Sequence, residues 1–192
     1  MTPPTIIEQL VEWHGIRHRN VEGIVTHAMG EYIVVPGKGT FHATEFLERS
    51  PELVGKTLSA HCLGQPNGEI VRLVPDDRLA WHAGESRLGD LIGLNKTFLG
   101  YEWLVPGEWH ITAFNDAMRT GKAQFTPEQY ESGGWQYAQW MNAYDFGRHR
   151  VVTHAQVAGD DVRGPGRGKL DPGVGFNQGR LSIAIDRIRA ND

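Results

Sequence analysis

The sequence contains little cysteine and no long apolar run, and both shortages limit what the protein can be. Cys62 is the only cysteine among 192 residues, so the chain can form no internal disulfide and no zinc site built from several thiolates. No apolar run approaches the roughly 18 residues that a membrane-spanning helix needs. Residues 1–5 also lack the basic start and the apolar core of a secretion signal. We therefore expect a cytoplasmic protein with no membrane partner.

Positive charge is scarce as well. The chain carries 19 Lys and Arg against 23 Asp and Glu, for a formal net charge of −4. Non-specific binding to nucleic acid depends on clustered basic residues, so we expect no nucleic-acid partner. The basic residues between positions 148 and 169 fit a solvated surface better than a site that steers an anionic substrate. Sequence motifs of serine hydrolases, P-loop proteins and His-Glu-X-X-His zinc peptidases are absent.

The composition that remains is that of one folded domain. Hydrophobic residues make up 40% of the chain and charged residues 22%, and 192 residues suffice for one hydrophobic core. Segments with the patterns of strands and helices alternate, with no repeat and no linker between them. We predict a single α/β domain over residues 1–192, with a central mixed sheet flanked by helices. Its core would span about 21–181, after an N-terminal helical extension at 1–20, and we expect a monomer.

Local patterns predict the individual elements. Pro-Pro-Thr before the apolar spacing of residues 6–13 predicts a first amphipathic helix. Asn67-Gly68 predicts a tight hairpin between strands at 58–63 and 69–74. Thr126, Pro127 and Gln129 predict the start of a helix that extends to about residue 146. Further strands are expected at 21–26, 97–105 and 150–153, and further helices at 44–50 and 177–188.

Two histidines and one aspartate are candidate metal ligands. His27 and His154 each follow a β-branched apolar run, which would place them at strand ends on one rim of the sheet. Asp171 lies in a Lys-Leu-Asp-Pro-Gly segment whose turn would hold a carboxylate rigidly. Neutral imidazoles and a carboxylate suit a hydrolytic zinc site, and Lys169 could stabilise charge on an attacked carbonyl. The alternatives are two structural histidines and an aspartate that caps a turn.

Glu102 is the one charged residue inside an apolar strand. It is either exposed on an edge strand or a buried carboxylate whose raised pKa suits a general base. Trp81 and His82 lie on a predicted loop earlier in the chain, after residues 75–78. There they could form a substrate wall or anchor the loop to the core. His61 lies within a predicted strand, so a core position competes with a substrate contact there.

Four segments carry a resemblance to a known family. Residues 59–63, 67–70, 73–77 and 80–84 have the order and spacing of a histidine-bearing strand, a hairpin, a Leu-Val-Pro-Asp strand end and Trp-His-Ala-Gly. In this the chain resembles the zinc-dependent N-acetylmuramoyl-L-alanine amidases, which include AmpD and phage endolysins and share their fold with peptidoglycan recognition proteins. The likeness extends over about residues 21–181.

The resemblance implies roles for each candidate residue. It implies one zinc ion per chain, a peptidoglycan or muropeptide substrate, and hydrolysis of the amide between the muramic acid lactyl group and L-alanine. The ligands of the zinc ion would be His27, His154 and Asp171. Glu102 would act as general base and Lys169 would stabilise the tetrahedral intermediate. The candidate substrate contacts are Trp81, His82 and His61.

Two departures from the family pattern bear on the biological role. Ala28-Met29-Gly30 follow His27 where the family usually has histidine and threonine, and residues 159–166 are inserted between His154 and Asp171. These departures favour a phage or prophage endolysin. The alternatives are a cytosolic amidase that recycles anhydromuropeptides and a peptidoglycan-binding protein of the same fold without catalysis.

Overall fold

Two 13-residue strands, β3 (Gly23–Val35) and β10 (Phe98–His110), form the centre of the fold in the computed structural model, which describes residues 2–190. They run parallel and in register until a bulge between Val105 and Glu108. Both strands begin within two residues of the predicted starts but continue well past the predicted ends. Beyond the bulge the same two strands still pair, so their mutual hydrogen bonds maintain extended structure where the hydrophobic pattern weakens.

The central sheet is mixed, as predicted. Its strand order is β1-β6-β5-β10-β3-β11, and β4 pairs with β3. The pairs β5/β6 and β3/β4 are antiparallel and the others are parallel. The predicted hairpin around Asn67 and Gly68 joins β5 to β6, and Gly68 has a φ of 85°, which a glycine adopts readily. The remaining strands of the sheet are β1 (Ile6–Glu8), β4 (Gly39–His42), β5 (Cys62–Gly64), β6 (Ile70–Arg72) and β11 (Val151–Thr153).

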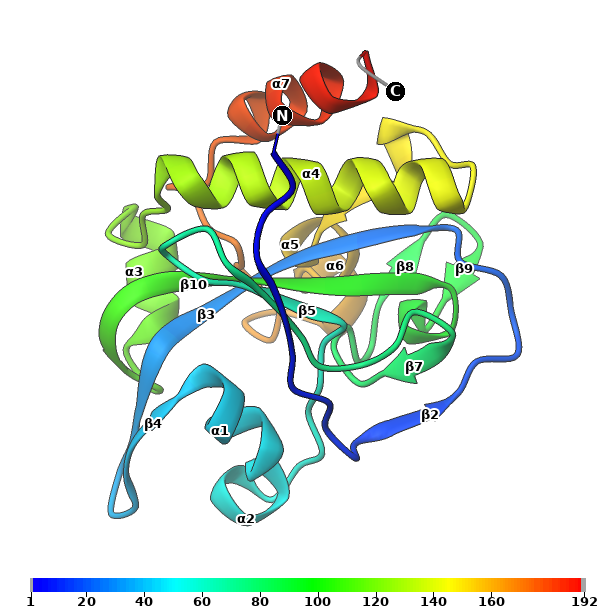
Figure 1. Cartoon of the computed structure of the whole chain (residues 1–192). Helices are drawn as coiled ribbons and strands as arrows, with labels where there is room; N and C mark the ends of the chain where they lie inside the picture. The colour runs from blue at the N-terminus through cyan, green and yellow to red at the C-terminus, as the bar shows by residue number, and fades with distance from the viewer. Residues whose placement is uncertain (1, 191–192) are drawn as a thin grey trace.

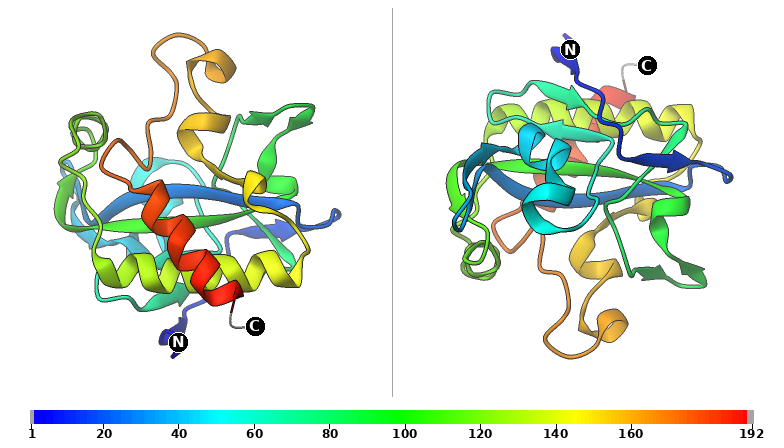
Figure 2. Two further views of the ribbon diagram at one scale, coloured as in Figure 1. Left: turned by 90° about the horizontal axis from the view of Figure 1, so that it is seen from above. Right: turned by 90° about the horizontal axis from the view of Figure 1, so that it is seen from below.

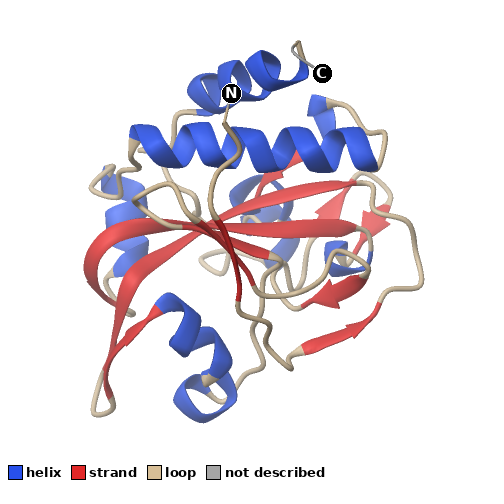
Figure 3. Cartoon of the chain, in the orientation of Figure 1, coloured by secondary structure: helices blue, strands red, loops and turns tan. Residues whose placement is uncertain are grey.

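Helices cover both faces of the sheet, which gives three layers (Figures 1 and 3). On one face α4 (Pro127–Ala143) runs along the central strands and α7 (Gln178–Arg189) packs on α4. On the other face α1 (Ala43–Glu48) packs against β3 and is followed by α2 (Ser50–Val54). The capping box predicted for α4 is present, with Thr126 and Gln129 bonded to each other's backbone amides. No helix among residues 2–190 is long and apolar enough to cross a membrane.

The remaining elements are short. A segment at the β11 edge projects from the body of the domain and carries α5 (His154–Val157) and α6 (Asp160–Arg163) (Figure 2). The others are β2 (His14–Ile16), β7 (Arg78–Ala80), β8 (Arg87–Leu88), β9 (Leu91–Ile92), α3 (Phe114–Thr120) and two short 3-10 helices, η1 (Leu94–Lys96) and η2 (Arg148–Arg150).

The predicted helix at residues 6–13, and with it the helical extension at 1–20, is wrong. The segment instead forms β1, which pairs parallel with β6 at the edge of the central sheet, and β2, which pairs antiparallel with β7. After β1, the backbone amides of Gln9 and Val11 donate to Arg72 and Leu73. A helix of eight residues is marginal by itself, whereas β6 offers an unpaired edge and Ile6-Ile7 favour extended structure.

Candidate metal centre and catalytic site

His27 and Glu102 lie on the same face of the central sheet. They are register partners on β3 and β10, and side chains of paired residues on adjacent strands project to one side. The preceding residue points the other way, since the Thr26 hydroxyl lies 3.0 Å from the Tyr137 hydroxyl of α4. His27 therefore faces away from α4. It is the fifth residue of β3, and does not lie at the strand end that the sequence predicted.

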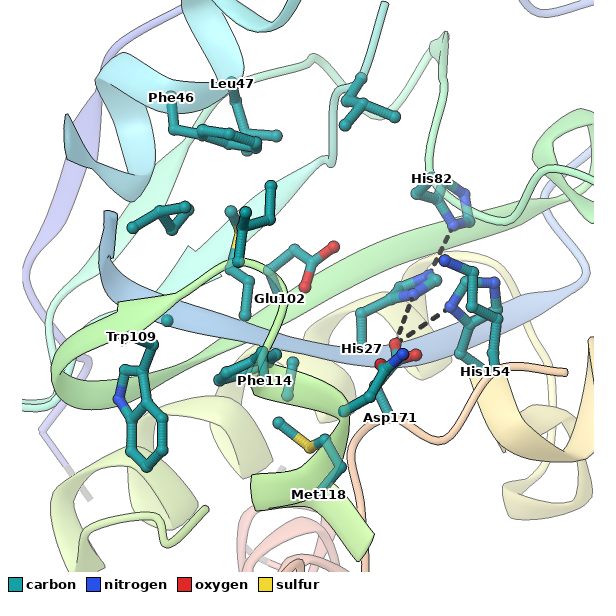
Figure 4. Close-up of a pocket in the computed structure, with 18 of the residues that line it drawn as sticks. His27, Phe46, Leu47, His82, Glu102, Trp109, Phe114, Met118, His154 and Asp171 are labelled. Carbon is teal, nitrogen blue, oxygen red and sulfur yellow. Dashed lines mark hydrogen bonds and ion pairs between the residues drawn. The ribbon is translucent and has the colours of Figure 1, made fainter. Parts of the chain in front are cut away.

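His154 and Asp171 reach the same place from the segment after β11. His154 is the first residue of α5, whose N-terminus is capped by Thr153 and Gln156. Asp171 is held beside α5 because its carbonyl accepts from the Ala155 amide at 3.0 Å. Its carboxylate Oδ2 lies 3.0 Å from His154 Nδ1 and 3.3 Å from His27 Nδ1 (Figure 4). One potential ligand atom from each of the three residues lies within 4.8 Å of the other two.

Hydrogen bonds behind His27 assign its tautomer. His82 Nε2 lies 3.2 Å from the Phe98 carbonyl, which can only accept, so this nitrogen carries the proton. Burial is the main cause that lowers the pKa of His82 well below its usual value, and the neighbouring His27 and His61 lower it further. The ring is therefore neutral and its Nδ1 accepts. The donor to that atom is His27 Nε2, at 2.9 Å. Burial also lowers the pKa of His27 to about 4, which leaves a lone pair on its Nδ1.

His154 is oriented in the same way. Its Nε2 lies 3.2 Å from the Ala83 carbonyl and therefore carries a proton, and in the neutral ring the lone pair is then on Nδ1, which faces Asp171. Two imidazole lone pairs and a carboxylate oxygen thus converge on one point. Such a group of acceptors suits a divalent cation, and two histidines with one carboxylate leave a position open for water or substrate, as in catalytic zinc sites.

Glu102 is a further titratable group of the site. Its Oε2 is buried and has no hydrogen-bond partner among the described residues. Burial is the main cause that raises the pKa of Glu102 to about 8, and the charge of Asp171 contributes as well. A carboxyl group with a pKa near neutrality can both accept and return a proton at physiological pH. The alternative of an exposed edge-strand residue is wrong, because β10 lies between β5 and β3.

The site opens into a cavity of about 260 Å³. His27, Glu102, His154 and Asp171 form one end together with Lys169, and Trp81, which is 42% exposed, contributes to the rim. The opposite end is apolar, with side chains from α1, β10 and α3 (Figure 4), among them Phe46, Leu47, Trp109, Phe114 and Met118. This wall was not predictable from the sequence, because an apolar residue that lines a cavity has the same local pattern as one in the core.

The structure corrects the interpretation of His61 and refines that of His82. His61 is fully buried and does not line the cavity. Its Nδ1 accepts from the Gly100 amide at 2.9 Å and its Nε2 lies 3.1 Å from the Arg78 carbonyl, so its role is in the core and the predicted substrate contact is wrong. His82 does line the cavity, but both of its ring nitrogens are bonded within the protein.

An α/β domain with two histidines, one aspartate and a partly buried glutamate beside a cavity has the features of a metal-dependent hydrolase. A family model described as N-acetylmuramoyl-L-alanine amidase matches residues 16–174. The chain belongs to this family, as the resemblance in the sequence indicated.

Individual relatives agree with this assignment. The 1,6-anhydro-N-acetylmuramyl-L-alanine amidase AmpD of Escherichia coli K12 is 27% identical over 136 residues, which cover 71% of this chain and 63% of that protein. AmpD of Salmonella typhimurium LT2 is 43% identical over 134 residues, 70% of this chain and 60% of that protein. The matched region thus spans about 60% of the length of these relatives. A crystal structure of an AmpD derivative, 24% identical, has the same fold, with a TM-score of 0.71 and 94% of each chain covered.

Proposed function

We propose that this protein is a zinc-dependent amidase that hydrolyses the bond between the lactyl group of muramic acid and L-alanine, with anhydromuropeptides as its substrates. The observation that carries the proposal is the arrangement of Glu102, whose Oε2 is buried and whose pKa is raised to about 8, beside two histidines and an aspartate whose acceptor atoms converge. Membership in the amidase family supplies the substrate class.

The zinc ligands in this proposal are His27 Nδ1, His154 Nδ1 and a carboxylate oxygen of Asp171. When bound, zinc acts as a Lewis acid and lowers the pKa of a water ligand to about 7. The hydrogen bonds from His27 to His82 and from His154 to Ala83 hold both rings with Nδ1 toward the ion. Neither histidine then has to change its tautomer when the metal binds.

Glu102 is the proton carrier. It takes a proton from the attacking water and gives it to the departing alanine nitrogen, so that the carbonyl carbon gains oxygen as the carbon–nitrogen bond breaks. The products are a lactyl carboxylate on the sugar and a peptide with a free amino terminus. Lys169, which lines the same end of the cavity, supplies positive charge for the carbonyl oxygen. Trp81 at the rim offers an aromatic surface to the substrate.

The names of the curated relatives support a recycling role. Both AmpD proteins are named for 1,6-anhydro-N-acetylmuramyl-L-alanine. The endolysin hypothesis, drawn from the residues after His27 and from the inserted segment, gains no support from these relatives. The retained donor atoms and Glu102 argue against a binding protein without catalysis. We therefore favour the alternative that the sequence left open, a cytoplasmic amidase acting on released muropeptides.

The test is product analysis by mass spectrometry on two substrates, a purified anhydromuropeptide and intact sacculi. We expect a free stem peptide from the anhydromuropeptide, at a rate at least tenfold above release from sacculi. A chelator should abolish the reaction and one equivalent of zinc should restore it. Magnesium is the control ion, because it prefers six oxygen ligands and suits this donor set poorly.

The possible results separate the parts of the proposal. Faster release from sacculi than from the anhydromuropeptide would favour the endolysin. Cleavage elsewhere in the muropeptide would contradict the bond assignment. Full activity in the chelator-treated, metal-free protein would contradict the role of zinc.

A further inference from the structure

The dipeptide His82-Ala83 contacts both histidines of the candidate metal centre from behind. Its first residue accepts from His27 through the ring Nδ1, and its second accepts from His154 through the carbonyl oxygen. Asn95 Oδ1 accepts from the backbone amides of His82 and Ala83, at 3.1 and 2.7 Å. The position of this dipeptide therefore determines how both imidazoles are oriented.

The Ala83 carbonyl has a second donor, Arg163. Arg163 Nη2 lies 3.0 Å from the Ala83 oxygen, and Nε of the same guanidinium lies 2.9 Å from the Glu85 oxygen. A carbonyl oxygen has two lone pairs, so His154 and Arg163 can donate to it together. The planar guanidinium spans the turn from Ala83 to Glu85 and bonds to both of its ends.

Gly84, at the centre of this turn, provides the space for the guanidinium. Its φ is 56°, in the left-handed region that favours glycine. A Cβ at this position would lie 2.8 Å from Arg163 Nη2. The turn is thus shaped so that the arginine can approach the backbone closely.

Arg163 belongs to the inserted segment that distinguishes this chain from the family pattern. It ends α6, and the loop after it returns to the start of the helix, where the Gly168 amide donates to Asp160 Oδ1 at 2.7 Å. Figure 2 shows this segment projecting beside the β8–β9 hairpin. The contact with the turn at Ala83 therefore joins the insertion to the metal centre.

We propose that Arg163 is a positioning residue for the zinc ligand His154. By holding the Ala83 carbonyl in place, it keeps the Nε2 proton of His154 bonded and the Nδ1 lone pair directed at the metal. Hydrogen-bond partners of metal ligands typically change metal affinity by roughly 10–100-fold when they are removed. The inference rests on the proposed zinc amidase, and it gives the insertion a function in metal binding.

The test compares zinc affinity in Arg163→Met and in Arg167→Met, measured by competition with a chromophoric chelator. Arg167 is the matched control, because it lies in the same insertion, is exposed, and pairs with the Glu85 carboxylate at 3.5 Å. We expect Arg163→Met to bind zinc at least tenfold more weakly than the wild type and Arg167→Met to bind within twofold of it. Arg163→Lys, which retains one donor group, should lie between wild type and Arg163→Met.

Two further readouts separate positioning from general destabilisation. Saturating zinc should restore kcat of Arg163→Met while KM for the muropeptide stays unchanged. The absorption spectrum of the cobalt-substituted variant should differ from that of the wild type, because the ligand geometry has changed. Should Arg163→Met fail to fold, Arg163→Lys against Arg167→Lys makes the same comparison, with at least a threefold difference expected.

Equal zinc affinity in the two members of a pair would overturn the inference. Failure of the wild-type protein to bind zinc would instead contradict the proposed function, so the two failures are distinguishable.

Discussion

Glu102 is the direct register partner of His27 across the β3–β10 pair. Adjacent strands lie about 4.8 Å apart, so the sheet itself places a carboxyl beside a candidate metal ligand. Glu102 also lies between the metal centre and the apolar end of the cavity (Figure 4). The proposed base and the proposed metal thus occupy one rigid surface, where the spacing is determined by backbone hydrogen bonds.

This relationship predicts that Glu102→Gln retains zinc but loses activity. The amide has the shape of the carboxyl and cannot accept and return a proton, so we expect a roughly 10²–10⁴-fold fall in kcat. Release of stem peptide from an anhydromuropeptide measures the rate, and metal analysis measures bound zinc. Asp171→Asn is the comparison variant and should lose zinc and activity together. An unaltered rate in Glu102→Gln would remove Glu102 from its role.

Gly100 is predicted to be required for the orientation of His27. A Cβ at Gly100 would lie 2.5 to 2.8 Å from three atoms of the His82 ring, including Nδ1, which accepts from His27. Gly100→Ala should therefore displace His82, weaken zinc binding and lower the free energy of unfolding by about 1–3 kcal/mol. Urea unfolding and zinc titration measure the two effects.

The matched control for this substitution is Gly179→Ala in the first turn of α7. A Cβ there would have no neighbour closer than 3.4 Å, and alanine favours a helix over glycine. We expect unchanged zinc binding and no loss of stability in this control. If Gly100→Ala behaved in the same way, the close packing of His82 on the strand would be unimportant.

His61 is predicted to make folding sensitive to mild acid. Burial is the main cause that lowers the pKa of His61 from 6.5 to about 3, and the charge of Arg17 lowers it further. The folded protein therefore keeps this ring neutral. The unfolded chain binds a proton below pH 6.5 and the folded chain does not, so stability falls as the pH drops from 6.5 toward 3. At pH 5 the loss from this residue is about 2 kcal/mol, from 1.5 pH units at 1.36 kcal/mol each.

His61→Gln offers the same donor and acceptor without a titrating ring. Urea unfolding of the metal-free protein at pH 7.5 and pH 5.0 tests the prediction. We expect the free energy of unfolding to change between these pH values by about 2 kcal/mol less in the variant than in the wild type. An identical change in both proteins would show that His61 titrates alike in the folded and unfolded chains.

Much of the fold was predictable because it depends on local patterns. The hairpin at Asn67-Gly68 and the start of α4 at Thr126 each follow from the conformational or hydrogen-bonding preferences of a few adjacent residues. The N-terminal segment was not predictable in this way. Its apolar spacing permits a helix, and the free edge of β6, 64 residues further along the chain, decides for a strand.

The candidate site likewise has features that the sequence predicts and features that only contacts between distant residues determine. The residue types of His27, His154 and Asp171, together with the family motifs, indicated a zinc site from the sequence. That His27 Nδ1 and Asp171 Oδ2, 144 positions apart, lie 3.3 Å from each other is a result of strand register and of the loop after β11. The burial of His61 and the donor role of Arg163 likewise follow from packing between distant segments.

The sequence by itself thus determined which chemical groups the protein has and which local elements most segments form, because both depend on residues close together in the chain. Only the tertiary structure decided which atoms of His27, His154 and Asp171 converge, that Oε2 of Glu102 is buried, and where the cavity opens. The physical reason is that distances between remote residues, and the exclusion of water that shifts a pKa, depend on how the sheet pairs and on what packs against it.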